Sequence, residues 1–344
     1  MATIALGSTI TIAEMLRRQT PDMRQADLID ITSQTNAIVK HATWMECNNG
    51  TYHEDTQIVT RPAGQKRAYD QGVSPEAMVT EKVLEPTIMH AGISQVDSKK
   101  AQHSVMGIAG FRAQEDGAFL IGLTEQFVSD LFDGNRSTNP LTINGLNNRS
   151  DYNTLSSSYV YDNAGGAASV TANKTSIYLI QWGGKKTNLI YPRHDTPGAI
   201  GSDMPIARKD FPESLITDAN DSTKKYPGYE TWFEIAYGWF ISDPRTVKRV
   251  ANISTSNIDG VDDFSFDEDL MIDAVTDLEY NGEGAMGLCN RTIWAQMWKR
   301  ANEKGNALFT QEGAEGPFAK RVLRFAGIPL DRCDAITNAQ ATLT

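Results

Sequence analysis

Apolar and polar positions alternate along the chain in ways that predict both helices and strands. The most regular pattern covers residues 111–132, where apolar side chains recur every four residues and so share one face of a helix. Those side chains are Phe119, Leu123, Phe127 and Leu131. A helix of this length spans roughly 33 Å. We expect Gly134 to end it, with Glu115 and Asp116 near its positively polarised start.

Three shorter helices are predicted elsewhere in the chain. A short one is expected over residues 98–106. Ser265 and Glu268 have the spacing of a capping box, which predicts a helix carrying the apolar positions of 271–278. A further helix is expected over residues 292–302, with Gly305 as its stop signal.

The first residues predict a surface arm. Thr11 and Glu14 form another capping-box spacing, so a short helix should begin at Ile12. Pro21 separates it from a second helical stretch, in which Ala26 and Ile29 recur at helical spacing. The apolar face of this stretch is too thin for a globular core, so we expect it to lie on another surface.

The segment from Trp44 to about His90 is rich in charges and turn residues and cannot build a core of its own. The run 51–60 next to residues 67–73 predicts a long two-stranded excursion. An isolated hairpin is marginally stable in water, so a long polar one is expected to gain order from a neighbouring molecule.

Further strands follow a loop predicted over residues 139–173. The sequences SIYLIQW and TNLIYPR, joined by residues 183–186, predict a hairpin. Another pair of strands is expected within 229–240, whereas 246–254 is consistent with either a helical turn or a strand. The C-terminal RVLRFAGIPLDRCDAIT predicts a strand, a tight turn and another strand.

Composition narrows the classes of protein that this chain can be. With 344 residues, 40% of them hydrophobic, one or two domains with a real core are expected. No apolar stretch is long enough to cross a membrane, and no secretory signal is recognisable at the start, so folding in a cytoplasm is expected. A net charge of −11 argues against a protein that wraps or grips nucleic acid.

The sequence carries little recognisable chemistry. No two of the five histidines have the spacing of helical metal ligands, and the three cysteines, Cys47, Cys289 and Cys333, are far apart and read as reduced core residues. WGGKKT lacks the first glycine of a phosphate loop, and the acidic run 259–269 lacks the pattern of a calcium loop. We therefore expect no catalytic residue, no metal and no cofactor, and a protein that is not an enzyme.

Several long segments, taken in order, resemble one known family. They include TIAEMLRRQTPDMRQADLIDITSQTNAIV, WMECNNGT, AYDQGVSPEAMVTEKV, GFRAQEDGAFLIGLTEQFVSDLFDGN, SIYLIQWGGKKTNLIYPR, ETWFEIAYGWFISDPRTVKRVANI and RFAGIPLDRCDAI. In this order they resemble the major capsid proteins of tailed bacteriophages, of the short type seen in podoviruses. One departure is at residues 37–39, where relatives tend to carry a proline after the asparagine; this affects only the conformation of the arm.

The resemblance implies an α+β fold of the Hong Kong ninety-seven phage capsid type. Residues 1–45 would be an N-terminal arm, and 46–89 an extended loop that lies over an adjacent subunit. Residues 90–140 and 170–254 would form a peripheral domain, whose long spine helix covers about 111–132. Residues 141–169 and 255–344 would form an axial domain.

The resemblance also implies a function and partners. Copies would assemble into hexamers and pentamers of an icosahedral head, with a portal at one vertex, a scaffold and a possible decoration protein, and would contact the packaged DNA weakly. Assembly would occur in the bacterial cytoplasm, without a membrane. The alternatives are the shell of an encapsulin-type nanocompartment, which shares the fold, and a soluble hydrolase with an unrecognised site.

The residues proposed for contacts between subunits lie in the extended loop. Near its tip, Arg61, Lys66 and Arg67 would pair with carboxylates of a neighbouring subunit. Glu54 and Asp55 are the acidic candidates. The alternative is a charged hairpin that contacts only solvent.

Overall fold

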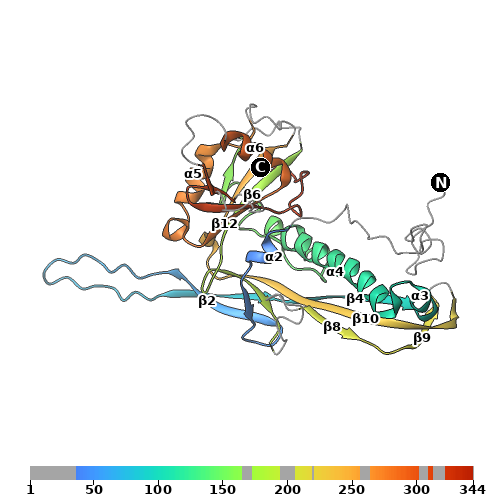
Figure 1. Cartoon of the computed structure of the whole chain (residues 1–344). Helices are drawn as coiled ribbons and strands as arrows, with labels where there is room; N and C mark the ends of the chain where they lie inside the picture. The colour runs from blue at the N-terminus through green and yellow to red at the C-terminus, as the bar shows by residue number, and fades with distance from the viewer. Residues whose placement is uncertain are drawn as a thin grey trace. The chain divides into compact units, whose positions relative to one another are not determined.

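A computed structural model places the chain in two compact units (Figure 1). It describes residues 36–164, 173–193, 206–218, 221–255, 264–301, 309–312 and 322–343. The first unit contains Met89–Val128 and the described residues of 196–236, which begin at residue 206. The second contains the described residues of Thr35–Ile88, Ser129–Asp195 and Tyr237–Thr344. The helix predicted to begin at Ile12, the helical stretch containing Ala26 and Ile29, and the stop signal at Gly305 lie outside the described residues.

The first unit combines a helix with antiparallel strands. Strands β8 (Ile206–Asp210) and β9 (Ser214–Asp218) pair one after the other with the long strand β10 (Asp221–Ile241), and β4 (Ile88–Asp97) is also its neighbour. Helix α3 (Ser98–His103) precedes α4 (Gly107–Asp133), and both contribute to a core of Val96, Ala101 and Phe111. Further along α4, the ring of Phe119 stacks on that of Phe233, with centroids 5.5 Å apart.

A seven-stranded sheet forms most of the second unit. Its strands are β5 (Val160–Asp162), β6 (Lys174–Gln181), β11 (Val247–Ser254), β12 (Ala285–Cys289), β13 (Phe309–Glu312), β14 (Val322–Phe325) and β15 (Ile328–Arg332), in the order β13-β14-β15-β12-β6-β11-β5. Helices α5 (Glu268–Thr276) and α6 (Arg291–Ala301) pack on it through a shared apolar core that includes Met271, Ile293 and Met297 (Figure 1). Short 3-10 turns occur at Leu146–Asn148, Pro244–Thr246 and Glu279–Gly282.

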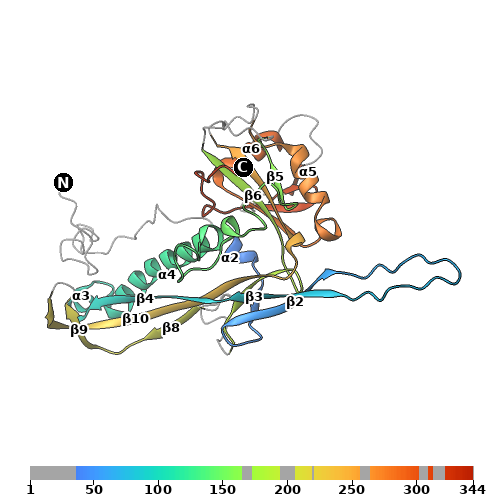
Figure 2. The ribbon, with the colours of Figure 1, turned by 180° about the vertical axis from the view of Figure 1, so that it is seen from behind.

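The second unit also contains a smaller group of strands and a hairpin. Strand β1 (Trp44–Glu46), which follows the one-turn helix α2 (Ile38–His41), runs parallel to β7 (Thr187–Tyr191). The last residues of β10 pair antiparallel with β7. Strands β2 (Tyr52–Thr60) and β3 (Val79–Pro86) form a two-stranded ladder that extends away from the sheets of its own unit (Figures 1 and 2).

The long helix is confirmed, but it begins four residues before the predicted start. The left-handed Gly107 (φ +70°) separates it from α3, which places Glu115 and Asp116 in the third turn and not at the helix N-terminus. The expectation that these two carboxylates meet the positive end of the helix is therefore wrong. The helix ends at Asp133 as predicted, and the amide of Gly134 donates to the carbonyl of Asp130 at 3.0 Å.

The predicted hairpin of SIYLIQW and TNLIYPR is wrong. Strand β6 pairs with β11 and β12, whereas β7 pairs with β1 and β10, so the two runs belong to different sheets. The turn between them does form, with Lys185 in the left-handed region (φ +59°). Both strands are almost wholly buried, so each apolar run could have formed a buried strand in either sheet.

Three other strand predictions needed correction or resolution. The pair of strands expected within 229–240 is a single strand, β10, and residues 246–254 are a strand, β11, preceded by a 3-10 turn. In the excursion, β2 pairs with Val79–Pro86 and not with 67–73. The loop predicted over 139–173 contains a 3-10 turn and β5.

The C-terminal elements agree more closely with expectation. Helix α6 lies over the predicted residues, and β14 and β15 form the predicted strand, turn and strand, with Ala326 (φ +47°) and Gly327 (φ +85°) in the turn. The start of α5 is displaced, because Asp267 and not Ser265 caps it by accepting from the amide of Asp269 at 3.0 Å. No helix in the described ranges is both long and apolar enough to span a membrane.

Candidate subunit interface

The ladder of β2 and β3 forms the stem of a long projecting loop. The register runs from Tyr52 opposite Pro86 to Thr60 opposite Val79, with an irregularity between Ile58 and Thr60. We call residues 46–89 the extended loop, and residues 61–78, which are not part of the ladder, its tip. Every residue of the tip is exposed.

The tip is organised by side-chain contacts to the backbone. The amide of Gly64 donates to Glu76 Oε2 at 3.0 Å, and that of Ser74 donates to Gln65 Oε1 at 3.4 Å. These two contacts connect the outgoing and returning segments of the tip, which do not pair as strands. The tip therefore has a preferred path but little buried surface to stabilise it.

The three predicted cations all lie in the tip. Arg61, Lys66 and Arg67 are exposed, and within the described part of the chain none of them forms an ion pair. The prediction that they pair with a neighbouring subunit is therefore compatible with their position, and it stays a prediction.

The two predicted carboxylates lie at the stem and are engaged within the chain. Glu54 pairs with Lys82 across the ladder, and Asn48 contacts both the amide and the carbonyl of Glu54. Asp55 accepts a hydrogen bond from the hydroxyl of Ser242 at 3.0 Å. The structure does not bring Glu54 and Asp55 together with Arg61, Lys66 and Arg67.

A set of contacts that the sequence did not indicate fixes the base of the extended loop. The guanidinium of Arg149 donates from Nη1 and Nη2 to the two carboxylate oxygens of Glu85, at 2.5 and 3.0 Å. Gln57 Nε2 donates to the carbonyl of Ser242 at 2.5 Å, and Asp55 accepts from the hydroxyl of the same serine. We call Asp55, Gln57, Glu85, Arg149 and Ser242 the base clamp. No local pattern predicts it, because Arg149 and Ser242 are distant in sequence from the loop.

The extended loop also exposes apolar side chains. Tyr69 in the tip is 99% exposed, and Val59 and Leu84 on the stem are 59% and 56% exposed. Ile58, Val73, Met78 and Val79 are also large, apolar and exposed. So many apolar side chains on one projecting segment are typical of a surface that another molecule covers.

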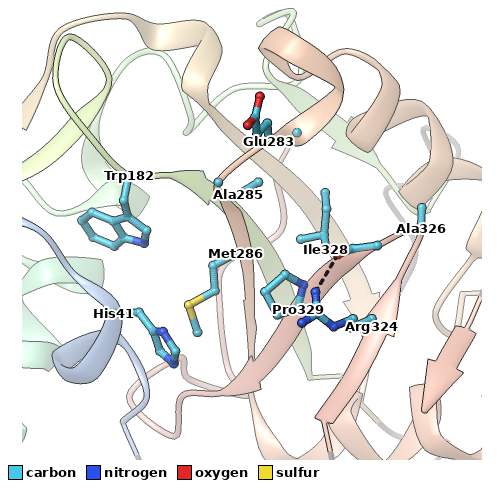
Figure 3. A pocket seen from close by; sticks show the side chains of 12 residues that line it. His41, Trp182, Glu283, Ala285, Met286, Arg324, Ala326, Ile328 and Pro329 are labelled. Carbon is cyan, nitrogen blue, oxygen red and sulfur yellow. Dashed lines mark hydrogen bonds between the residues drawn. The ribbon is translucent and has the colours of Figure 1, made fainter. Parts of the chain in front are cut away.

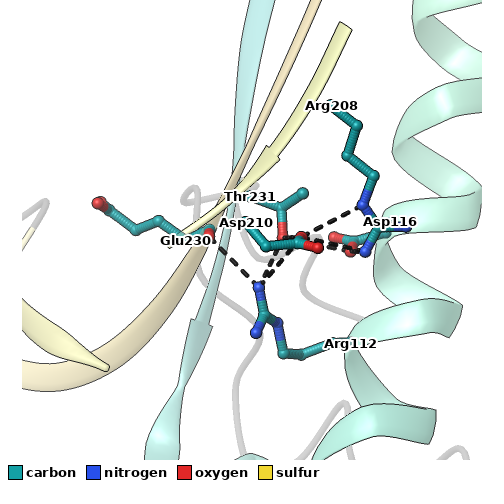
Figure 4. Close-up of polar contacts among 6 residues, drawn as sticks. All are labelled: Arg112, Asp116, Arg208, Asp210, Glu230 and Thr231. Atoms are coloured by element: carbon teal, nitrogen blue, oxygen red, sulfur yellow. Dashed lines mark hydrogen bonds and ion pairs between the residues drawn. The ribbon is translucent and has the colours of Figure 1, made fainter. Parts of the chain in front are cut away.

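A partly buried polar cluster in the first unit joins β8 and β10 to α4 (Figure 4). Asp116 is 4% exposed and accepts from Arg208 Nη2 at 3.0 Å and from the hydroxyl of Thr231 at 3.2 Å. Arg112 donates to Thr231 Oγ1 at 3.0 Å, and both arginines contact Asp210. Every buried charge has a partner here, so the cluster reads as structural.

One pocket in the second unit has a volume of about 600 Å³. Figure 3 shows His41, Trp182, Met286 and Pro329 along its wall, with the carboxylate of Glu283 directed away from His41. His41 contacts Asp331 at 3.3 Å, and Arg324 donates to the carbonyl of Gly327 at 3.2 Å. The lining residues bring together no nucleophile and base at hydrogen-bonding distance.

The three cysteines and the possible metal ligands are the other candidate reactive groups. Burial raises the pKa of the thiols of Cys47 and Cys333 to about 12 and also raises that of Cys289, so none of these thiols is primed as a nucleophile. In the described ranges, no group of three or more His, Cys, Asp or Glu side chains is arranged to hold a metal ion.

A family model described as major capsid protein GP7 matches residues 20–344. The chain belongs to this family. It is a major capsid protein of a tailed bacteriophage and a structural component of the virion, as the resemblance implied. No curated protein matches the sequence.

Several solved structures are similar to this chain. A chain in the cryo-EM structure of bacteriophage epsilon15 is 26% identical, with a TM-score of 0.74, and the match covers 100% of this chain and 99% of that one. The bacteriophage JBD30 capsid matches at 12% identity and a TM-score of 0.48, over 95% of this chain and 99% of that one. An encapsulin complex from Synechococcus elongatus matches at 10% identity and a TM-score of 0.47, over 74% of this chain and 98% of that one.

The likeness to the epsilon15 chain confirms the predicted fold class. The mixed helices and sheets match the Hong Kong ninety-seven-like phage capsid fold. The function that the family membership carries is that of a phage major capsid protein.

Proposed function

We propose that copies of this capsid protein assemble into hexamers and pentamers of an icosahedral head that encloses double-stranded DNA. In this proposal the arm (1–45) and the extended loop make contacts between subunits. The peripheral domain (90–140 and 170–254) and the axial domain (141–169 and 255–344) form the tile itself. A closed ring of identical subunits uses two different patches on each copy, so a projecting element on one side suits such a ring.

The extended loop is the observation that best supports this proposal. It combines an exposed tip, exposed apolar side chains and three cations without ion-pair partners among the described residues. A two-stranded segment of this kind is marginally stable alone and is stabilised when a second molecule covers it. Burying one large apolar side chain contributes about 1.5–3 kcal/mol, whereas an exposed ion pair contributes at most about 1 kcal/mol.

The apolar residues would therefore contribute most of the binding free energy between subunits, and the cations would fix the register in which the subunits meet. In this proposal Arg61, Lys66 and Arg67 pair with carboxylates of the neighbouring subunit. Glu54 and Asp55 act at the stem of the loop, where they hold its shape for that contact.

Other partners follow from the same function. A portal at one vertex, a scaffold protein and a decoration protein would complete the head during assembly in the host cytoplasm. The net charge of −11 is compatible with a shell that surrounds DNA without gripping it. The shell has a structural and not a catalytic role in this proposal.

Charge reversal in the tip tests the proposal. A variant with Arg61→Glu, Lys66→Glu and Arg67→Glu should yield at least tenfold fewer closed shells in electron microscopy. The matched control, with Arg61→Lys, Lys66→Arg and Arg67→Lys, keeps the charges and should assemble normally. Because the replaced side chains are exposed, the free energy of unfolding should change by less than about 0.5 kcal/mol. Normal shells from the reversed variant would exclude this role of the tip.

A second measurement concerns the content of the particle. Shells purified from infected cells should contain phage DNA. An enzyme cargo in place of DNA would instead favour the encapsulin-type alternative.

A further inference from the structure

The base clamp contacts both strands of the extended loop. Glu85 belongs to β3, while Asp55 and Gln57 belong to β2. In the ladder Asp55 lies opposite Val83, and Glu85 lies opposite His53. The positions that the base clamp contacts on the two strands therefore lie within a few residues of one another. The clamp therefore fixes the stem as a unit.

The Arg149–Glu85 pair is the strongest contact of the clamp. The side chains are only 14% and 19% exposed, and the two parallel hydrogen bonds set both the distance and the orientation of the carboxylate. A carboxylate this sheltered that lost its arginine would be left without a compensating charge. The pair thus has a single favourable geometry.

Arg149 is itself held in place by its surroundings in the second unit. Its Nε donates to the carbonyl of Asn144 at 3.1 Å, and its own carbonyl accepts from the amide of Tyr152 at 3.0 Å. The hydroxyl of the buried Tyr152 donates to the carbonyl of Pro244, two residues beyond Ser242. The amide of Ser242 donates to the carbonyl of Lys186 at 3.0 Å. Both anchors of the clamp therefore belong to the ordered body of the unit.

A small change at this base has a large effect at the tip. From His53, which lies opposite Glu85, to Thr60 at the end of β2 is about 24 Å at about 3.4 Å per residue, so a rotation of about 10° at Glu85 moves that end by about 4 Å. A displacement of that size breaks hydrogen bonds and ion pairs, which are lost within about 1 Å of their optimal distance.

We propose that Arg149 is a positioning residue for assembly, because its fork on Glu85 sets the direction in which the extended loop leaves the subunit. This inference rests on the proposed function of the loop in contacts between subunits. It assigns to Arg149, which lies outside the loop, control over whether neighbouring subunits join at the angle that a closed shell requires.

Charge exchange tests this role in assembly reactions with the full chain. Arg149→Glu and Glu85→Arg should each give at least tenfold fewer shells of the normal diameter, with open or irregular particles in their place. The double variant Arg149→Glu with Glu85→Arg should recover most of the normal shells. Arg149→Lys, which keeps the charge but loses the fork, should give an intermediate yield. Normal shells at the wild-type yield from Arg149→Glu would overturn the proposal.

A distance measurement separates positioning from a general loss of folding. Spin labels at Ala68→Cys in the tip and Ser158→Cys on the body of the same unit report the direction of the loop in unassembled subunits. The native cysteines are at most 2% exposed and should stay unlabelled. We expect the distance distribution to broaden at least twofold in Arg149→Glu and to narrow again in the exchanged double variant. An unchanged distribution in Arg149→Glu would overturn the positioning role even if assembly failed.

The tip variant distinguishes the two proposals. If charge reversal at Arg61, Lys66 and Arg67 blocks assembly but Arg149→Glu forms normal shells, only the positioning role fails. If the tip variant assembles normally, the proposed function of the loop tip fails.

Discussion

The indole of Trp182 stacks on the indole of Trp239 in the second unit, with ring centroids 5.7 Å apart and planes inclined by 14°. Trp182 directly follows β6, which lies in the seven-stranded sheet, and Trp239 lies opposite Leu189 of β7. The stack therefore marks the point where the chain leaves one sheet and enters the next. Trp239 is fully buried, and its Nε1 donates to the carbonyl of Leu131 at 2.8 Å.

Trp239 should therefore be a major contributor to stability. Trp239→Ala should lower the free energy of unfolding by about 3–5 kcal/mol, because it opens a large cavity beside Trp182. Trp239→Phe should cost about 1–3 kcal/mol, since it still leaves the carbonyl of Leu131 without its donor. Urea denaturation of unassembled subunits measures both values. The half-buried Trp294 offers a control, because Trp294→Phe should cost less; a loss below about 1 kcal/mol for Trp239→Ala would contradict this account.

The same crossing point explains why one strong sequence prediction was wrong. SIYLIQW and TNLIYPR carry the signals of a hairpin, two apolar runs joined by a glycine-containing turn, and the turn exists. Strand pairing, however, depends on partners far along the chain: β11 and β12 for the first run, β1 and β10 for the second. Because both runs are buried, alternation carried no information about which sheet each would join.

Helices were predicted better than strand partners because their pattern is local. The four-residue repeat of Phe119, Leu123, Phe127 and Leu131 was sufficient to find α4. This repeat gives no information about the contact of Asp116 with Arg208, which is 92 residues away in sequence. Cap positions were less certain, since Ser265 and Asp267 both offer a suitable oxygen before α5, and only the backbone geometry selects Asp267.

The candidate interface was predictable in part. Charge and turn residues located the extended loop and its exposed cations, whereas the register of β2 with β3 was missed because residues 61–78 separate the two strands. The base clamp could not be predicted, because Arg149 and Glu85 are 64 residues apart and neither lies in a recognisable motif.

Two glycines of the first unit should respond in opposite ways to the same change. At Gly92 of β4, an added Cβ would lie 2.2 Å from Cζ of Phe119, a ring that is already stacked on Phe233. Gly92→Ala should therefore lower the free energy of unfolding by about 1–3 kcal/mol through overpacking.

At Gly117, within α4, an added Cβ meets nothing within 4 Å. Gly117→Ala should raise the free energy of unfolding by about 0.5–1 kcal/mol, because alanine restricts the unfolded chain and favours the helix. Thermal and urea unfolding of the two variants side by side check both signs. A stabilising Gly92→Ala would show that Phe119 can move away without cost.

His53 should make stability depend on pH. Its ring packs on Phe240, with centroids 4.2 Å apart, and its Nδ1 is buried without a hydrogen-bond partner. This burial lowers the pKa of His53, against the opposing influence of the Asp55 carboxylate and the carbonyl of Glu46, and Glu85 lies opposite His53 in the ladder. The folded protein therefore takes up this proton at a lower pH than the unfolded chain does.

The sign of the effect follows from that difference. Above the unfolded pKa of about 6.5, both states hold a neutral His53, and its burial costs nothing in proton binding. As the pH falls below that value the unfolded chain binds the proton first, so the free energy of unfolding should decrease until the lowered folded pKa is reached. Urea denaturation between pH 8 and pH 5 measures this slope. His53→Phe should make the slope shallower, whereas a change at the exposed His103, such as His103→Gln, should leave it in place. An identical slope in His53→Phe and in the wild type would show that His53 is not the residue responsible.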